Sequence, residues 1–181
     1  MYARSMEVCV LGREEALALL EPYREHFVAL DARGFVDSID PEVLIDSPDV
    51  LVYDGDYEVD ALHLEAHTPS VIVMGNLRVR DLLRQDFQAG ALTVLGDLHA
   101  GTIATEGEIF AGGNIVADQL AYGCSATRGM KSLGRMQTPW LIADRGYVFA
   151  PAGGLDAGVF IDLEGGTDEL VEFRRAVHPY A

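Results

Sequence analysis

The residues that most suggest chemistry are His63 and His67, four apart in the segment HLEAH. Histidines at that spacing share one face of a helix, and a glutamate directly after the first completes the zinc motif of many metalloproteases. Here Leu64 stands in the glutamate's place. The surrounding repeat places His63 in a strand or a turn, where residues four apart do not share a helical face. The sequence therefore predicts no metal site, and no cofactor-binding motif accompanies it.

Outward carboxylates are the second possible source of chemistry. Glycan-cleaving enzymes built from stacked coils use acids in an outer groove, at a separation of about 5–10 Å. Candidates by position are Asp81, Asp86, Asp97, Glu106, Glu108 and Asp118. No spacing pairs them, and neither Cys9 nor Cys124 lies in a motif for nucleophilic catalysis or metal binding. We expect no catalytic residue and classify the protein as not an enzyme, with a glycan-active enzyme as the least favoured alternative.

The charge balance limits the kinds of partner. The chain has 181 residues and a net charge of −16, from 29 acids and 13 bases. Nucleic-acid binding depends on cationic contacts to phosphate, so we expect no nucleic-acid partner. No run of about 18 apolar residues predicts a membrane helix, and no secretory signal is recognisable. We expect a cytoplasmic protein whose acidic surface attracts a basic protein. The alternative is that the acidic charge serves only to keep the protein soluble.

A repeat of about twenty residues must position all of these side chains. Gly55, Gly75, Gly96, Gly113 and Gly134 are separated by 20, 21, 17 and 21 residues. Two residues after each glycine stand Tyr57, Leu77, Leu98, Ile115 and Met136; seven after stand Leu62, Leu82, Ile103, Leu120 and Leu141. Apolar residues alternate within each repeat, as in a strand with one buried face. The pattern predicts an all-β-dominated fold, a single-stranded parallel β-helix of five to six coils.

The turns and the outward residues define the register of these coils. We expect each glycine to supply a backbone conformation that other residues adopt only with strain. The Asn or Asp that follows each of the first four glycines should stack on its neighbours, whereas Arg135 follows the fifth. Stacking in register also predicts two ion pairs, Glu58 with Arg78 and Asp60 with Arg80. Pro139 cannot donate to a sheet, so its strand is expected to lie near an end of the column or to bulge.

Helices are expected to cover both ends of the column. Residues 1–50 read as an N-terminal cap, with a helix over 13–34, and residues 51–163 as the β-helix. Within it, 150–158 reads as a loop and 159–163 as a last strand. Residues 164–181 read as a C-terminal capping helix, with Thr167 as its N-cap and arginines near its end.

The segments VMGNLRVRDLL, VLGDLHAGTI and LAYGCSATRGMKSLGRMQTPWLIADRGY resemble a bacterial family of small β-helix (β-solenoid) proteins of uncharacterised function. The resemblance covers about residues 50–149. More distantly, the coils resemble bactofilins, which are polymer-forming proteins of the cytoskeleton. The fifth coil departs from the pattern at Arg135 and Pro139, which puts an end-to-end filament through that coil in doubt. The resemblance implies a rigid, non-catalytic surface used for binding or assembly.

These features favour a non-catalytic, acidic binding protein, with an immunity- or antitoxin-like role toward a basic protein partner. A bactofilin-like, self-assembling scaffold is the main alternative, and a homodimer is compatible with either. The expected partner-binding face follows the outward residues of the middle coils: Arg78, Arg80, His99, Asp118 and Tyr122. The sequence shows no partner for His99.

Overall fold

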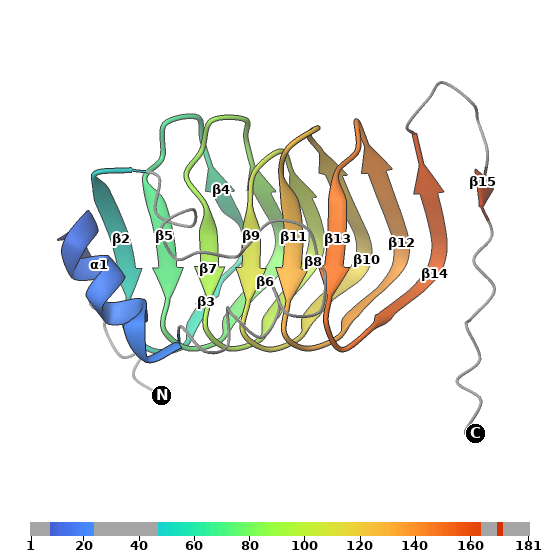
Figure 1. Ribbon diagram of the computed structural model, residues 1–181. Coiled ribbons are helices and arrows are strands. Elements are labelled where there is room, and N and C mark those ends of the chain that lie inside the picture. Colours follow the sequence, from blue (N-terminus) through green and yellow to red (C-terminus); the bar gives the residue numbers. More distant parts are fainter. Residues whose placement is uncertain (1–7, 24–46, 164–169, 172–181) are drawn as a thin grey trace.

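The chain folds into a column of stacked coils, shown in Figure 1. The computed structural model describes residues 8–23, 47–163 and 170–171. Most coils contribute one short strand to a first sheet and, after a tight turn, one longer strand to a second sheet. About six coils are stacked, so the fold is a β-solenoid. At this level the predicted fold class is confirmed.

Two sheets form the walls of the column. The first has the strand order β1-β2-β5-β7-β9-β11-β13; the second has the order β15-β14-β12-β10-β8-β6-β3, with β4 also on β6. The first sheet consists of β1 Val8–Gly12, β2 Asp49–Tyr53, β5 Ser70–Val73, β7 Leu92–Val94, β9 Ile109–Ala111, β11 Gly129–Ser132 and β13 Val148–Pro151. The second consists of β3 Tyr57–Val59, β4 Leu62–Leu64, β6 Leu77–Gln85, β8 Leu98–Thr105, β10 Ile115–Cys124, β12 Met136–Asp144, β14 Leu155–Asp162 and β15 Leu170–Val171. Neighbours pair in parallel except β1 with β2 and β14 with β15.

Aliphatic side chains from successive coils meet inside the column, as the glycine spacing predicts. Leu77, Leu98 and Ile115 are register partners on the second sheet, and none is more than 1% exposed. Leu92 and Ile109, paired on the first sheet, belong to the same core. Burying one such side chain completely stabilises the fold by about 1.5–3 kcal/mol. The core is therefore one continuous stack that runs along the column.

Asparagine and aspartate at the turns form a ladder of hydrogen bonds between coils. The backbone N–H of Asn76 donates to Asp56 Oδ1 at 2.7 Å, and that of Asp97 donates to Asn76 Oδ1 at 2.8 Å. The same bond joins Asn114 to Asp97 at 2.6 Å and Arg135 to Asn114 at 2.9 Å. The predicted stacking is confirmed. The ladder ends at Arg135, since a guanidinium has no acceptor to offer a further coil.

Four of the five repeat glycines are needed for close approach rather than for a left-handed backbone, which corrects the prediction; at Gly55 the prediction is confirmed. Of the five, only Gly55 has a positive φ, +88°. At Gly134 an added Cβ would lie 2.6 Å from Asn114 Oδ1 and 2.7 Å from the carbonyl carbon of Gly113. Successive turns touch here, because the Gly134 N–H donates to the Gly113 carbonyl at 2.9 Å. Only a hydrogen atom fits between the coils.

The longer strands bend at a corner, where two of them carry one extra residue. The register shifts lie just before Leu82 in β6 and just before Leu120 in β10. An extra residue reverses the alternation beyond it. Leu83 and Ala121 therefore face the core at 0% exposure, whereas Leu82 is 39% exposed. The prediction that Leu82 and Leu120 point inward is wrong for this reason.

Among the described residues, antiparallel strands rather than helices lie at both ends of the column. At the first end β1 pairs with β2, and at the other end β15 pairs with β14. An added strand satisfies backbone groups that a sheet edge would otherwise expose. The predicted C-terminal helix is wrong at Leu170 and Val171, which form β15. The other residues of that predicted cap, 164–169 and 172–181, lie outside the described residues.

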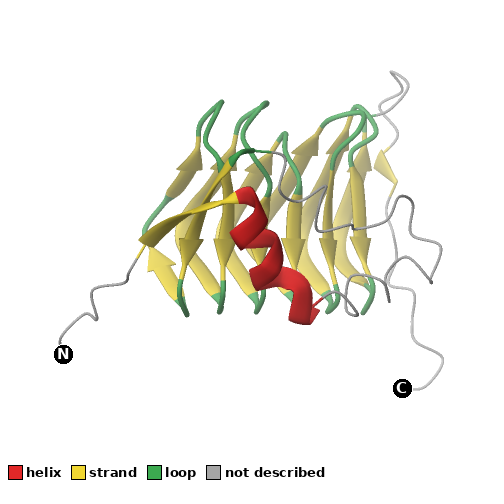
Figure 2. Ribbon diagram, turned by 60° about the vertical axis from the view of Figure 1, so that its left-hand side comes forward, coloured by secondary structure: helices red, strands yellow, loops and turns green. Residues whose placement is uncertain are grey.

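The short helix α1, Arg13–Leu20, covers the outer face of the first sheet rather than the end of the column (Figure 2). Its Ala16 and Leu20 are fully buried and belong to a second apolar cluster with Val50 and Ile72. A 3-10 helix, η1 Glu21–Tyr23, follows. The predicted helix over 13–34 is thus found at its start, and residues 24–34 lie outside the described part of the chain.

The segment predicted as a loop, 150–158, contains strand residues at both ends, since β13 runs to Pro151 and β14 begins at Leu155. Pro139 lies within β12, in the corner beside Gly158, where an added Cβ would be 2.7 Å from the Pro139 carbonyl oxygen. The register partners resume at Trp140. Proline lacks an N–H to donate, but here it lies at the bend, and the residues on both sides, Thr138 and Trp140, remain paired with β14.

Candidate binding face

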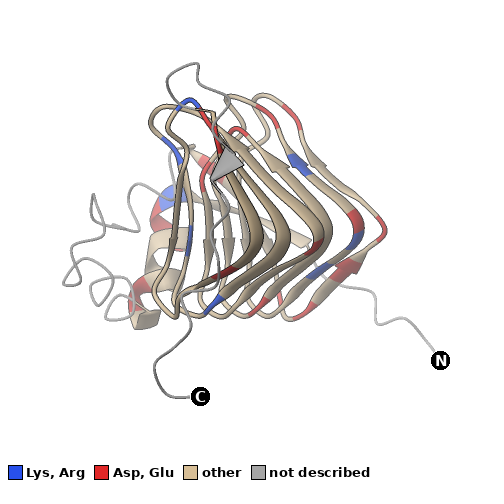
Figure 3. Cartoon of the chain, turned by 90° about the vertical axis from the view of Figure 1, so that its right-hand side faces the viewer, with Lys and Arg blue, Asp and Glu red and all other residues tan. Residues whose placement is uncertain are grey.

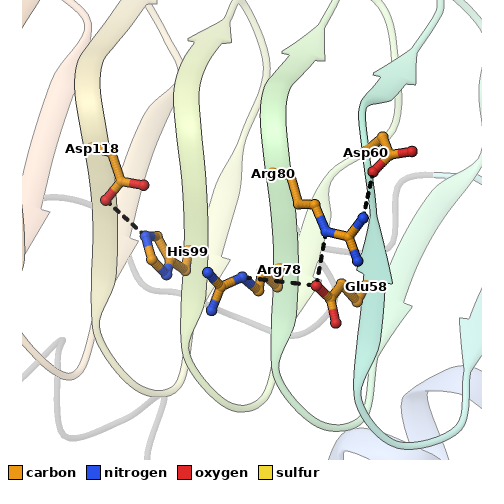
Figure 4. Close-up of polar contacts among 6 residues, drawn as sticks. All are labelled: Glu58, Asp60, Arg78, Arg80, His99 and Asp118. Carbon is orange, nitrogen blue, oxygen red and sulfur yellow. Dashed lines mark hydrogen bonds and ion pairs between the residues drawn. The ribbon is translucent and has the colours of Figure 1, made fainter. Parts of the chain in front are cut away.

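The outer surface of the second sheet carries the predicted face, and its arginines are engaged by acids of the preceding coil (Figure 4). Arg80 on β6 contacts Asp60 at 2.8 Å and Glu58 at 3.0 Å, and Arg78 lies 3.9 Å from Glu58. The hydrogen bond from Arg80 to Glu58, followed by the Glu58 charge, raises the pKa of the guanidinium. Both predicted ion pairs are confirmed. Glu58 also joins them into one network.

His99 has a partner that sequence reasoning missed. Its Nε2 lies 2.8 Å from Asp118 Oδ1, across one coil boundary between β8 and β10. Asp118 was expected to face outward, but it lies where the register shifts between Ala117 and Leu120, and the repeat spacing did not predict its contact with His99. The face therefore holds Arg78, His99 and Asp118 on three successive strands, with the histidine beside a carboxylate.

Tyr122 lies apart from the other four predicted residues, beyond the corner of β10. Its register partners are Ala104 on β8 and Ile142 on β12. The hydroxyl donates to Asp144 Oδ2 at 3.0 Å. Burial, followed by hydrogen bonding with Cys124 and Asp144, raises the pKa of Tyr122. The predicted face thus divides into a charged part before the corner and a second part that contains Tyr122.

The two histidines of HLEAH lie differently from those of a helical zinc site. His63 is on β4, and its Nε2 is 2.9 Å from Asp86 Oδ2, while Arg84 contacts the other oxygen of Asp86 at 2.8 Å. The hydrogen bond to His63 lowers the pKa of Asp86 most, and Arg84 lowers it further. His67 is in the following loop with φ +69°. Within the described residues, no three His, Cys, Asp or Glu side chains gather as a metal site would require.

One predicted outward acid, Glu108, is buried, which corrects its assignment. Its side chain is 6% exposed, and Oε1 lies 2.7 Å from Nζ of Lys131, the only lysine of the chain. Oε2 accepts the Gly129 N–H at 3.0 Å. Glu108 directly precedes β9, and Lys131 lies on β11, so the pair belongs to the side of the first sheet and not to the predicted face on the second. A buried carboxylate held in this way is a structural element, because removing either partner would leave an unpaired buried charge.

Tyr147 and Gln85 complete the buried polar contacts near this pair. Tyr147 donates to the Gly107 carbonyl at 2.9 Å. Burial, followed by the charge of Glu108, raises the pKa of Tyr147 well above its ordinary value. Gln85 donates to the Gly90 carbonyl at 2.8 Å and accepts from Thr105 at 2.7 Å. These residues tie several coils together inside the column.

An apolar patch lies on the second sheet, beyond the corner, and of its residues only Tyr122 belonged to the predicted face. It consists of Leu120, Tyr122, Trp140, Ile142, Val159 and Ile161. Sequence reasoning missed it because Leu120 was assigned to the core. A signal was present in the run Trp140–Leu141–Ile142, where three successive apolar residues of one strand must place apolar groups on both faces.

The fold and this face define a β-solenoid with a charged and an apolar region on one outer surface. No protein-family model, curated protein or solved structure matches the chain. Among the described residues, no helix is both long enough and apolar enough to span a membrane.

Proposed function

We propose that the chain is a non-catalytic binding protein that recognises a basic protein partner through the first half of its column. The uneven distribution of charge carries this proposal. Residues 47–111 contain eleven acids, Asp49, Asp54, Asp56, Glu58, Asp60, Glu65, Asp81, Asp86, Asp97, Glu106 and Glu108, and three bases, Arg78, Arg80 and Arg84. Acidic positions recur along the coils in Figure 3. A field of this kind speeds the encounter with a basic protein.

The ion pairs on the outer face leave this field in place. Each arginine of this half contacts a carboxylate, so its charge is balanced locally. Exposed carboxylates at Asp54, Glu65 and Glu106 contribute negative charge beyond those pairs. These three acids lie in the turns directly after β2, β4 and β8, so strands paired in register hold the turns in place. Little ordering would therefore be needed when a partner binds.

An immunity- or antitoxin-like role is the form of binding that this surface supports best, with the acids masking a basic surface of the partner. We place the interaction in the cytoplasm. The two cysteines, Cys9 and Cys124, are unpaired, in keeping with a reducing compartment. For the alternative of a bactofilin-like scaffold, the antiparallel strands at the two ends weigh against stacking of coils from one molecule to the next. The least favoured alternative, a glycan-active enzyme, remains a prediction from the sequence alone.

The test begins with capture of partners from the native host by the full chain at low salt. The captured protein is then purified, and its association rate with the chain is measured. The double variant Asp54→Asn/Glu106→Gln should lower that rate by about threefold or more, with the difference fading at high salt.

A matched control distinguishes the effect of charges in the acidic half from the effect of the net charge of the whole chain. The variant Glu14→Gln/Asp156→Asn removes the same charge from helix α1 and from β14, both outside residues 47–111. It should leave the association rate near that of the unaltered chain. A captured partner with an acidic surface, or equal losses in both variants, would contradict the proposal.

A further inference from the structure

The apolar patch occupies three neighbouring strands in two rows. One row is Leu120, Trp140 and Val159, and the other is Tyr122, Ile142 and Ile161, each on β10, β12 and β14 in turn. On each of the three strands, one residue lies between the two patch residues: Ala121, Leu141 and Phe160. These residues belong to the core or pack against it. The six patch residues therefore point outward.

These side chains are accessible to a partner surface. Trp140 is 48% exposed, and the other five are partly exposed. Contiguous apolar side chains on the flat face of a sheet mark contact sites in proteins, and tryptophan and tyrosine contribute most at the centre of such contacts. The patch thus has the composition of an interface core, and its occupant has to be identified from the charges around it.

The half of the column that carries the patch differs in formal charge from the first half. Residues 112–163 contain four acids, Asp118, Asp144, Asp156 and Asp162, and four bases, Arg128, Lys131, Arg135 and Arg145. The formal net charge of this half is zero, compared with three minus eleven, or −8, for residues 47–111. Under the function proposed above, a basic protein would bind the acidic half. The balanced half allows two identical surfaces to meet without strong repulsion.

We propose that the apolar patch joins two copies of this chain in a twofold-symmetric dimer centred on Trp140. In a twofold contact each surface must complement itself, and a sheet face of apolar side chains does so readily. Interfaces of homodimers are also more apolar than the rest of the surface. The proposal does not rest on the function proposed above, because the acidic half lies outside the contact and remains open to a basic partner.

Trp140 is the only tryptophan of the chain, so its fluorescence reports on the patch directly. The full chain should change from monomer to twice the chain mass in light scattering as its concentration rises. The emission of Trp140 should shift to shorter wavelength over the same range, because the indole leaves water. A constant monomer mass at every concentration would overturn the proposal.

Two variants locate the contact. Trp140→Glu should abolish the dimer, and Ile142→Glu should abolish both the dimer and the fluorescence shift while keeping the tryptophan. Phe87→Glu is the matched control, since Phe87 is 60% exposed but lies in the acidic half. It should dimerise like the unaltered chain. Circular dichroism and thermal unfolding establish whether each variant is folded. If Trp140→Glu does not fold, Ile142→Glu provides the test of the patch.

A dimer that survives both patch variants would overturn the proposal, as would its loss in Phe87→Glu. A chain shortened after residue 171 that dimerises while the full chain stays monomeric would assign the patch to the chain's own last residues instead. Loss of the dimer with an unchanged association rate for a basic partner would leave the proposed function standing. The two proposals can therefore fail separately.

Discussion

Gly134 illustrates how single residues set the distance between coils. The turn brings its backbone against the Gly113 carbonyl and the Asn114 side chain, and no room remains for a methyl group. Asn114 in turn accepts the N–H of Arg135 at 2.9 Å. The glycine permits the approach, and the asparagine uses it for a hydrogen bond. The two residue types are therefore required together.

We predict that Gly134→Ala destabilises the protein by about 1–3 kcal/mol, because the new methyl group forces the two turns apart. Denaturant unfolding followed by circular dichroism measures this. Gly12→Ala is the control: its Cβ would meet only Glu15, at an ordinary 3.8 Å, and φ is −69°. Its effect should stay within about 0.5 kcal/mol. Equal losses at the two positions would show that the close approach is not what requires glycine.

At the scale of elements, the extra residues in β6 and β10 decide which leucines form the core. Each shifts the alternation of its strand by one position. Leu82 and Leu83 are adjacent and chemically identical, yet one is exposed and the other fully buried. They form a natural pair of test and control.

Leu83→Ala should cost about 2–5 kcal/mol in unfolding free energy, because it leaves a cavity in the core. Leu82→Ala should cost less than about 1 kcal/mol, since its side chain already meets water. Urea unfolding curves of both variants supply the comparison. The reverse order of effects would mean that the strand follows the simple twenty-residue alternation without a shift.

Structural features that follow from the repeat itself could be predicted from the sequence. The recurrence of glycine and the alternation of apolar residues predicted the core column of Leu77, Leu98 and Ile115 and the pairs formed by Arg78 and Arg80. Features that break the repeat were not predictable in this way. An extra residue at a corner leaves the composition unchanged but turns Leu120 outward. Near Leu170 the sequence has a helical pattern, but pairing with the edge strand β14 makes this segment a strand.

The molecule as a whole joins coils that are distant in sequence through buried polar contacts. The hydroxyl of Tyr147 reaches the Gly107 carbonyl, 40 residues earlier, from a side chain that is 4% exposed. Burial raises the pKa of Tyr147 above that of an unfolded tyrosine. The folded state therefore retains this proton at a pH where the unfolded chain has begun to release it.

This contact predicts a loss of stability in alkali. The stability associated with a raised pKa is fully present below the unfolded value of about 10 and declines as pH rises toward the folded value. Tyr147→Phe cannot ionise, so its unfolding free energy should fall less steeply above about pH 10. At neutral pH the variant should lose about 1–3 kcal/mol, because the Gly107 carbonyl loses its donor. Urea midpoints across the pH range test both effects, and parallel curves would contradict the assignment.

The ladder at the turns has a consequence for how long such a protein can be. Each interior coil donates a backbone N–H to the coil before it and offers a side-chain oxygen as acceptor to the coil after it, so the joint between coils is the same from Asp56 to Arg135. A segment of one repeat could be duplicated in frame without creating a new kind of joint. Growth by whole modules would lengthen the molecule while preserving its two end strands, its acidic half and its neutral half.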